Sequence, residues 1–261
     1  MLSADTMALL SQFLEERDAA EAAAKTEATD MGEALLTEAD FGLSQFWYTP
    51  ETSVTLARLL VRLWKEAREA GGPAPGKIGF LAAPSAFKAF RSLISAGVAP
   101  EDQGVPMDAG VVFEYDDRFA VFGDQFVHYD YRKPHDIPDS HIGAYSVLLV
   151  DPPFLNEPAL AGFQATCTLL RQSSTTPVIA ATGAMVSNFV QKLLGARPTM
   201  FPIAHTHGLS NPFRIYVPNG RDDLAESLGG WDEELEAAIE EDRATRGGDG
   251  RLELDTHAAR K

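Results

Sequence analysis

An acid, two prolines and an aromatic ring, Asp151-Pro152-Pro153-Phe154, directly follow the apolar run Tyr145–Val150. Such a run predicts a buried strand of a parallel sheet, and in open α/β sheets the reactive groups gather where strands end. The prolines fix φ and lack N–H donors, so the loop offers carbonyl oxygens, a carboxylate and a π face. These groups could bind an amine: Asp151 and the Pro152 carbonyl would accept its hydrogens, and Phe154 would make a cation–π contact. An ordinary strand-ending turn is the alternative.

Further acids lie near the predicted ends of two other strands. Glu114 and Asp116 are two residues apart, so both would point to one face of an extended chain, where a carboxylate can accept hydrogen bonds from two hydroxyl groups. An exposed acid at the edge of the sheet, or a partner for Arg118, is the alternative. Asp130 follows a third apolar run, with Tyr131 beside it as a candidate ring contact, although the local sequence fits a turn aspartate equally well.

Histidine and cysteine give little support for a metal site. His205 and His207 would share one face of a strand, but no carboxylate or third histidine lies close to them in sequence. A structural or substrate-loop role is therefore favoured, and no metal is predicted. The single cysteine, Cys167, excludes an internal disulfide and a multi-cysteine zinc site.

The elements that must position these residues alternate between short apolar runs and helix-like segments. This alternation predicts βα units and a mainly parallel sheet covered on both faces. A short connection between the last two runs favours an antiparallel pair. The expected strands are 77–83, 110–115, 126–130, 145–151, 177–182, 199–204 and 213–218. The expected helices are 50–70, 86–96, 117–123, 157–172 and 184–194, the first of them capped by Thr49 and opened by Pro50.

Charge divides the chain into three parts. Residues 1–40 hold ten acids and two bases, and residues 221–261 hold thirteen acids and six bases, which leaves residues 41–220 with a net charge near −1. We therefore predict an acidic, partly helical leader over 1–40, one catalytic domain over 41–220, and an acidic, flexible tail over 221–261 in which 231–241 forms a short helix. A domain without basic character is unsuited to binding duplex nucleic acid, so no nucleic-acid partner is expected.

The sequence also bears on location. No apolar stretch approaches the roughly 18 to 20 residues of a membrane helix, and the first residues do not have the pattern of a secretory signal. We expect a soluble, cytoplasmic protein that needs no membrane.

Several blocks together resemble a known family. Residues 41–48, Ala83-Pro84-Ser85, residues 113–119, residues 126–131 and Asp151–Phe154 are similar to the elongation factor 1-alpha lysine methyltransferases, once described as N6-adenine-specific DNA methyltransferases. The resemblance covers about 41–217. It implies a class I, Rossmann-like methyltransferase fold with seven strands, one antiparallel strand at the end, and helices on both faces. It also implies S-adenosylmethionine as cofactor and a lysine of elongation factor 1-alpha as the methyl acceptor.

The resemblance assigns roles to particular residues. It implies that the cofactor contacts the loop Ala83-Pro84-Ser85, with small side chains where the wider class has glycines, and that Glu114, or in reserve Asp116, holds the ribose. It further implies Asp130 and Tyr131 beside the adenine, and Asp151 near the reacting atoms. The segment with Gln45 and Trp47 is expected to close over the cofactor or the lysine channel. An adenine-type nucleic-acid methyltransferase, which would need similar acceptors and stacking, and a non-catalytic cofactor-binding protein are the alternatives.

Overall fold

The computed structural model describes residues 47–70, 76–97, 99–100, 103–206, 208–209 and 211–246. Seven strands form one sheet in the order β3-β2-β1-β4-β5-β7-β6. Strands β1 to β5 are parallel to one another, and β7 runs antiparallel between β5 and β6. The expected α/β, Rossmann-like architecture, with a mainly parallel seven-stranded sheet, is confirmed.

The seven apolar runs all form strands, although most end one or two residues earlier than predicted. Their bounds are Lys77–Leu81 (β1), Gly110–Glu114 (β2), Phe126–His128 (β3), Tyr145–Val150 (β4), Val178–Gly183 (β5), Ala196–Pro202 (β6) and Phe213–Pro218 (β7). The register aligns Leu81, the last residue of β1, with Phe113 of β2 on one side and with Val150 of β4 on the other. The loops that follow these three strands therefore begin side by side.

Helices connect and cover the strands. Their bounds are Pro50–Glu69 (α2), Pro84–Ala96 (α3), Glu157–Leu170 (α4), Ser187–Leu194 (α5), Asp222–Ser227 (α6) and Glu233–Arg246 (α7). Short 3-10 turns lie at Met107–Ala109 (η3), Asp117–Gln125 (η4), Asp139–His141 (η5) and Ala184–Val186 (η6). The helix expected at 117–123 is thus a 3-10 segment, interrupted where Gly123 has a φ of 56°.

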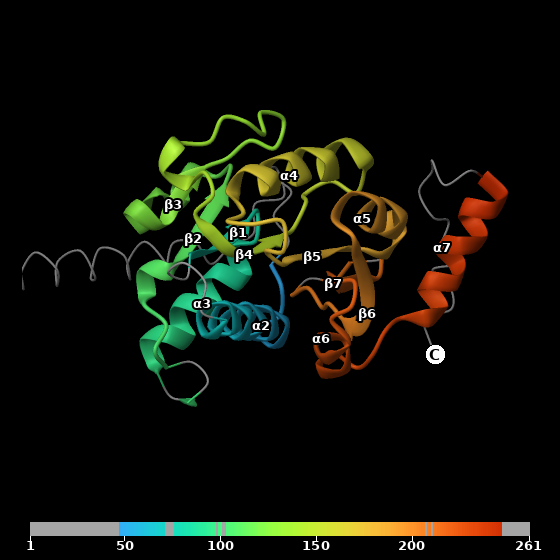
Figure 1. The fold of residues 1–261 in the computed structure, drawn as a ribbon, viewed down its shortest axis with the longest axis horizontal. Helices are drawn as coiled ribbons and strands as arrows, with labels where there is room; N and C mark the ends of the chain where they lie inside the picture. The colour runs from blue at the N-terminus through green and yellow to red at the C-terminus, as the bar shows by residue number, and fades with distance from the viewer. Residues whose placement is uncertain are drawn as a thin grey trace, which may run out of the picture.

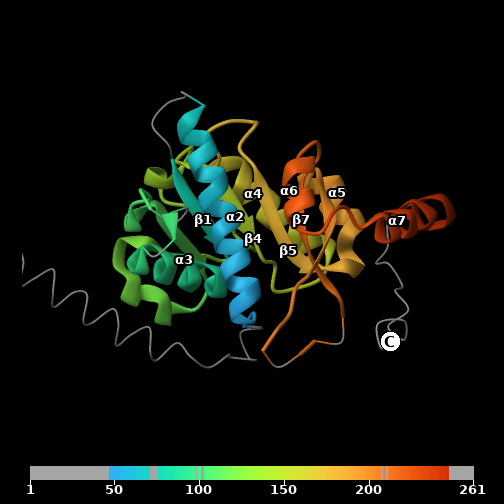
Figure 2. The same ribbon diagram turned by 90° about the horizontal axis from the view of Figure 1, so that it is seen from below.

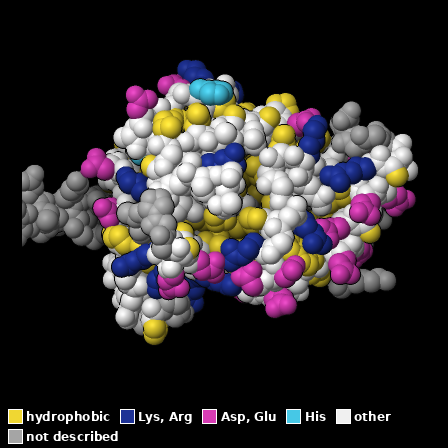
Figure 3. Space-filling model, in the orientation of Figure 1, with side chains coloured by type: hydrophobic (Ala, Val, Ile, Leu, Met, Phe, Trp, Pro, Cys, Tyr) yellow, Lys and Arg dark blue, Asp and Glu magenta, His cyan; other side chains and the backbone are white. Residues whose placement is uncertain are grey.

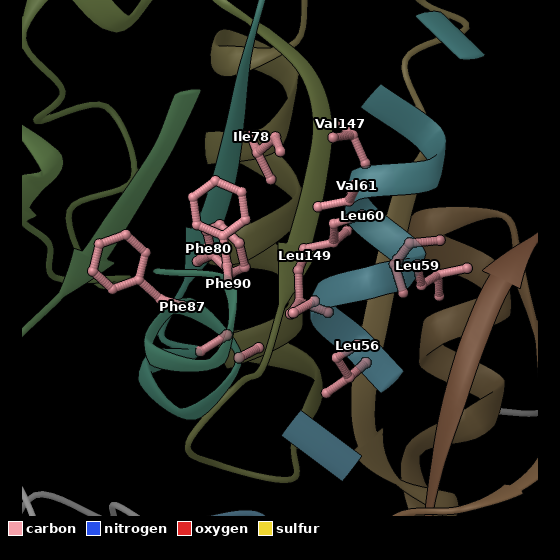
Figure 4. Packing of buried hydrophobic residues seen from close by; sticks show 14 of the residues in the cluster. Leu56, Leu59, Leu60, Val61, Ile78, Phe80, Phe87, Phe90, Val147 and Leu149 are labelled. Carbon is pink, nitrogen blue, oxygen red and sulfur yellow. The ribbon is translucent and has the colours of Figure 1, made fainter. Parts of the chain in front are cut away.

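Helix α2 shows how the sequence sets an element's position. The Thr49 side chain accepts a hydrogen bond from the Thr52 N–H at 3.4 Å, and Pro50 occupies the first turn, where no N–H is needed. Apolar residues then recur at helical spacing, so one stripe of the helix is buried against β1 and β4. Figure 4 shows Leu56, Leu60 and Val61 of α2 turned towards Val147 and Leu149 of β4.

Two apolar layers enclose the sheet (Figure 1). The first lies under α2, α3 and α6, and includes Phe80, Phe87 and Phe90. The second lies under α4 and α5, and includes Tyr145 and Phe163. Because both faces are covered, the strands read as continuous apolar runs, which is why the sequence indicated a parallel sheet.

The chain continues beyond β7 as two helices. Leu224, Ala225 and Leu228 at α6 belong to the same buried cluster as α2 and β1. Helix α7 overlaps the helix expected at 231–241 but continues to Arg246, and it packs through Leu235 and Ile239 on Ala184. Packing therefore extends past 220, the limit placed from the charge pattern, because apolar side chains stand among the acids of α6. Among the described residues, no helix is both long and apolar enough to cross a membrane.

Candidate functional site

A cavity of about 370 Å³ lies at the edge of the sheet where the parallel strands end. Antiparallel β7 begins at this edge, so its first residue also reaches the cavity. The lining residues are Trp47, Ala82, Pro84, Ser85, Glu114, Tyr115, Tyr129, Tyr131, Asp151, Pro152, Pro153, Leu155, Phe163, His205, Leu209, Asn211 and Phe213. The structure thus brings together the loops after β1, β2, β3 and β4, as the sequence predicted for this edge.

The turn between β1 and α3 has an unusual backbone. Ala82 has a φ of 50°, in the left-handed region that non-glycine residues rarely adopt, and its N–H donates to the Phe113 carbonyl at 2.8 Å. Helix α3 then starts at Pro84 without a side-chain cap, and Pro84 and Ser85 line the cavity. Ala83 is buried behind them. A helix N-terminus directed at a cavity favours an anionic group there, because its first N–H groups lack helical partners.

Ser85 has a contact that the sequence did not indicate. Its hydroxyl accepts a hydrogen bond from the Tyr48 N–H at 3.2 Å, and so ties the segment before α2 to the start of α3. Beside it, Trp47 lines the cavity, as expected for a closing segment, and its indole N–H is buried without a hydrogen-bond partner among the described residues. Gln45, expected in the same role, lies outside the described residues.

Of the acids expected to contact the ribose or the adenine, Glu114, Asp116 and Asp130, Glu114 alone lines the cavity. It is buried, and its carboxylate accepts hydrogen bonds from the N–H groups of Tyr115 at 2.9 Å and Asp116 at 3.3 Å. Asp116 is buried as well, but its carboxylate binds Arg118 at 2.6 Å and caps the first turn of η4, as in the alternative of a partner for Arg118.

Asp130 likewise lies away from the cavity. Its carboxylate binds the Arg132 guanidinium at 2.8 Å, and this hydrogen bond holds the pKa of Asp130 below its usual value. The neighbouring Tyr131 does line the cavity, and its ring stacks on Phe163 at 6.0 Å between centroids. The position of Asp130 therefore does not support the expected contact with adenine, whereas Tyr131 lies where such a contact could be made.

Asp151 is at the centre of the site. Its N–H donates to the Leu81 carbonyl at 3.0 Å, which fixes the loop after β4 against the end of β1. Protein atoms crowd around the side chain even though it lines the cavity, and this desolvation raises the pKa of the carboxyl to about 8. The nearby Tyr48 hydroxyl opposes that shift, and the charge of Glu114 adds to it. Ligand-free Asp151 is therefore largely protonated at neutral pH.

Tyr48, the last of three consecutive aromatic residues, lies next to the site, beside Asp151. Its hydroxyl is buried close to Asp151 but does not reach hydrogen-bonding geometry with any described residue. Burial first, and then the Asp151 charge, raise the pKa of Tyr48 well above its usual value, so the phenol stays a neutral donor. The phenol therefore lies as a buried donor beside the Asp151 carboxyl, and the two groups shift each other's pKa.

The remaining residues of the Asp-Pro-Pro-Phe loop divide between cavity and surface. Pro152 and Pro153 line the cavity, with Leu155 beyond them. Phe154 does not line it: its side chain is 45% exposed, and its ring contacts Tyr131 at 5.9 Å between centroids. Phe154 was expected to contact an amine in the site, but its ring instead packs on Tyr131 at the outside of the loop.

His205, which the sequence offered as half of a histidine pair, lines the cavity opposite these loops. Burial lowers the pKa of its imidazole to about 4, so the ring is neutral at neutral pH. His207 lies outside the described residues. Across the described ranges, no three His, Cys, Asp or Glu side chains are grouped so that they could hold a metal ion. No pattern in the sequence indicates that His205 and Asp151 line one cavity, because the two residues are far apart in the chain.

The chain is similar to known methyltransferases. The family model described as probable N6-adenine methyltransferase matches residues 39–219. EEF1A lysine methyltransferase 1 from Mus musculus is 34% identical over 218 residues, covering 83% of this chain and 90% of that protein. The Danio rerio protein of the same name is 34% identical over 67% of this chain and 95% of its own length. Protein-lysine N-methyltransferase EFM5 from Saccharomyces cerevisiae is 32% identical over 68% of this chain and 71% of that protein.

Proposed function

Because this chain belongs to the probable N6-adenine methyltransferase family, together with the EEF1A lysine methyltransferases, it is a protein-lysine N-methyltransferase, and we propose that it methylates a lysine of elongation factor 1-alpha. The cavity is the observation that best supports an active site at this edge of the sheet. It joins a desolvated acid, Asp151, to a buried acid, Glu114, and to a helix N-terminus at one sheet edge. We propose the cytoplasm, where translation elongation takes place, as the location of the reaction.

The residues present fit S-adenosylmethionine, which supplies the methyl group as part of a sulfonium cation. Glu114 would accept hydrogen bonds from the ribose hydroxyls, and the start of α3 at Ala83-Pro84-Ser85 would face the carboxylate of the cofactor. The Trp47 indole N–H, buried without a partner among the described residues, supports the presence of a polar occupant. Tyr131, stacked on Phe163, offers an apolar wall for the adenine ring. Asp116 and Asp130, paired with arginines, are proposed to support their loops instead.

The acceptor must be a neutral amine. A lysine has a reference pKa of about 10.4 and carries a proton at neutral pH, so its ammonium must lose that proton before transfer. Desolvation in the cavity and a neighbouring sulfonium would lower this pKa. The bound cofactor would supply an electrophilic methyl group, so the lone pair of the neutral lysine nitrogen would form the N–C bond and the electron pair of the broken S–C bond would stay on sulfur. Asp151 and the Pro152 carbonyl would hold the remaining N–H groups and align the nitrogen.

The test of this proposal uses the purified full chain, labelled S-adenosylmethionine and purified elongation factor 1-alpha. We expect label on one or more lysines of that protein, sensitive to protease and resistant to nuclease. Asp151→Asn keeps the shape of the side chain but removes its charge, and should slow transfer by about 100-fold or more. Asp139→Asn makes the same chemical change at an exposed residue and should transfer at the wild-type rate.

Two results would contradict the proposal. Label that enters added nucleic acid and is lost on nuclease treatment would favour an adenine-type methyltransferase. Cofactor binding without transfer to either substrate would favour a non-catalytic protein. The near-neutral charge of residues 41–220 argues for a protein acceptor, because a nucleic-acid substrate calls for a basic surface.

A further inference from the structure

The strand order divides the cavity into two halves. β4, which carries Asp151 at its end, lies in the middle of the sheet, with β1, β2 and β3 on one side and β5, β7 and β6 on the other. Ala82 and Glu114 line the half beside β1 and β2. Phe213 and the connection before it line the half beyond β4. An in-line displacement needs the nucleophile and the leaving group on opposite sides of the methyl carbon, so the two halves suit two different occupants.

The connection between β6 and β7 is fixed against the segment that precedes α2. The Thr49 N–H donates to the Ala204 carbonyl at 2.9 Å, and the Thr206 N–H donates to the Trp47 carbonyl at 2.9 Å. Tyr48 and His205 therefore form an antiparallel bridge. Figure 2 shows this connection running to the start of α2. These backbone hydrogen bonds fix the position of His205 beside the cavity.

The His205 ring is enclosed by two aromatic rings. Its centroid lies 4.9 Å from the Tyr48 ring and 4.8 Å from the Phe213 ring. No described side chain forms a hydrogen bond with its ring nitrogens. The imidazole thus lines the cavity as an oriented polar group whose hydrogen-bonding capacity is not used within the described residues.

We propose that His205 is a substrate-binding residue, whose ring nitrogen accepts a hydrogen bond from the amine of the incoming lysine in the half of the cavity walled by Leu209, Asn211 and Phe213. This inference rests on the proposed function, since it assumes that the cofactor fills the half beside Glu114. Asp151 and the Pro152 carbonyl would accept from the same amine on the β4 side. The amine would then be held from both sides, and these hydrogen bonds would restrict the directions in which its lone pair can point.

The packing around His205 suits this role. A protonated imidazole would repel both a lysine ammonium and a sulfonium, whereas a neutral ring offers a lone pair to an N–H group. Burial between Tyr48 and Phe213 disfavours the charged form and lowers the pKa of the imidazole to about 4.

The test compares kcat and KM for elongation factor 1-alpha with the separately measured Kd for S-adenosylmethionine. His205→Phe keeps a ring between Tyr48 and Phe213 but removes the acceptor. We expect kcat/KM to fall by about tenfold, as for the loss of one hydrogen bond to a polar substrate group, while the cofactor Kd changes by less than about twofold. His135→Phe, at an exposed histidine, is the control and should match wild type.

A second pair of variants separates the acceptor from the packing. His205→Asn and His205→Leu have nearly the same shape, and the first alone keeps an acceptor, so His205→Asn should retain a kcat/KM at least about fivefold higher. Equal kcat/KM for the two would overturn the proposal, as would a wild-type kcat/KM in His205→Phe or a matching loss of cofactor binding. Failure of the proposed function is distinguishable, because then the wild-type protein itself would not methylate elongation factor 1-alpha.

Discussion

Asp151 illustrates how a site residue can reduce the stability of the protein that carries it. Its carboxyl is desolvated and lies near a second acid, Glu114, so the folded protein holds a proton that the unfolded chain releases at neutral pH. A bound sulfonium or ammonium would favour the ionised form. Placing a carboxylate where a cation would bind therefore lowers the free energy of unfolding of the protein.

This linkage predicts a pH-dependent stability difference. The pKa of Asp151 is raised to about 8 in the folded protein, so its contribution to the free energy of unfolding declines as pH rises from about 4 through 8. Asp151→Asn cannot ionise. Its stability relative to ligand-free wild type should be greater at pH 8.5 than at pH 5.5 by at least about 1 kcal/mol, measured by denaturant unfolding.

Asp130→Asn is the matched control for that measurement. Hydrogen bonding to Arg132 lowers the pKa of Asp130, so its stabilising contribution is present above the usual carboxyl range and is lost only at more acidic pH. The difference between this variant and wild type should stay constant from pH 5.5 to 8.5. A constant difference for Asp151→Asn as well would show that the Asp151 carboxyl is already ionised in the folded protein.

The two acids at the end of β2 are predicted to differ in cofactor binding. Glu114→Gln should raise the Kd for S-adenosylmethionine by about tenfold, because a neutral amide is a weaker acceptor for two hydroxyls than a carboxylate. Asp116→Asn should change it by less than about threefold, since Asp116 binds Arg118 outside the cavity. Calorimetric titration measures both values. The reverse order would assign the ribose to Asp116.

At the scale of elements, the β1–α3 turn depends on one strained residue. An alanine in the left-handed region costs roughly 1 to 2 kcal/mol, and glycine avoids that cost but loses about 0.5 to 1 kcal/mol of backbone entropy. Ala82→Gly should therefore raise the free energy of unfolding by about 0.5 to 1 kcal/mol.

The control for this prediction is Ala86→Gly, in the first turn of α3, where φ is helical and the methyl group is buried. That change should destabilise the protein by about 1 kcal/mol or more. Thermal unfolding of both variants measures the contrast. Destabilisation of Ala82→Gly by as much as Ala86→Gly would mean that contacts of the Ala82 methyl group outweigh the backbone strain.

At the scale of the whole molecule, the two C-terminal helices differ in how firmly they are attached. α6 contributes Leu224 and Leu228 to the main apolar cluster, and Arg221 beside it binds Glu66 of α2 at 2.8 Å. α7 packs through a much smaller cluster at the outer side of the sheet, next to β6 (Figure 1). Figure 3 shows acidic side chains gathered over the region of α7.

Truncation tests where the folded domain ends. Removal of residues 233–261 should lower the Tm by a few degrees and change the cofactor Kd by less than about twofold, since α7 does not line the cavity. Removal of residues 221–261 also deletes Leu224 and Leu228, and should cost at least about 4 kcal/mol, from two buried leucines. Equal stability of the two truncated proteins would place the boundary at 220.

Local patterns in the sequence determined the elements and the edge of the sheet that carries the site. Burial on both faces gives continuous apolar strands, capping residues set the start of α2, and the residue types after each strand mark Asp151 and Glu114 as candidates. These signals are local, because each depends on neighbouring residues within one element. The ion pairs of Asp116 and Asp130 also have a local basis, because each aspartate pairs with an arginine two residues later in the chain.

Only the tertiary structure decided which of these candidates share a cavity. Tyr48 and His205 meet across more than half of the chain through backbone hydrogen bonds that carry no sequence signature. The left-handed turn at Ala82 is set by the adjoining strands, and alanine itself gives no indication of it. The Phe154 ring points to Tyr131 because of packing around the loop. Contacts between distant segments depend on how the layers assemble, so the sequence determined the framework and the fold determined the site's composition.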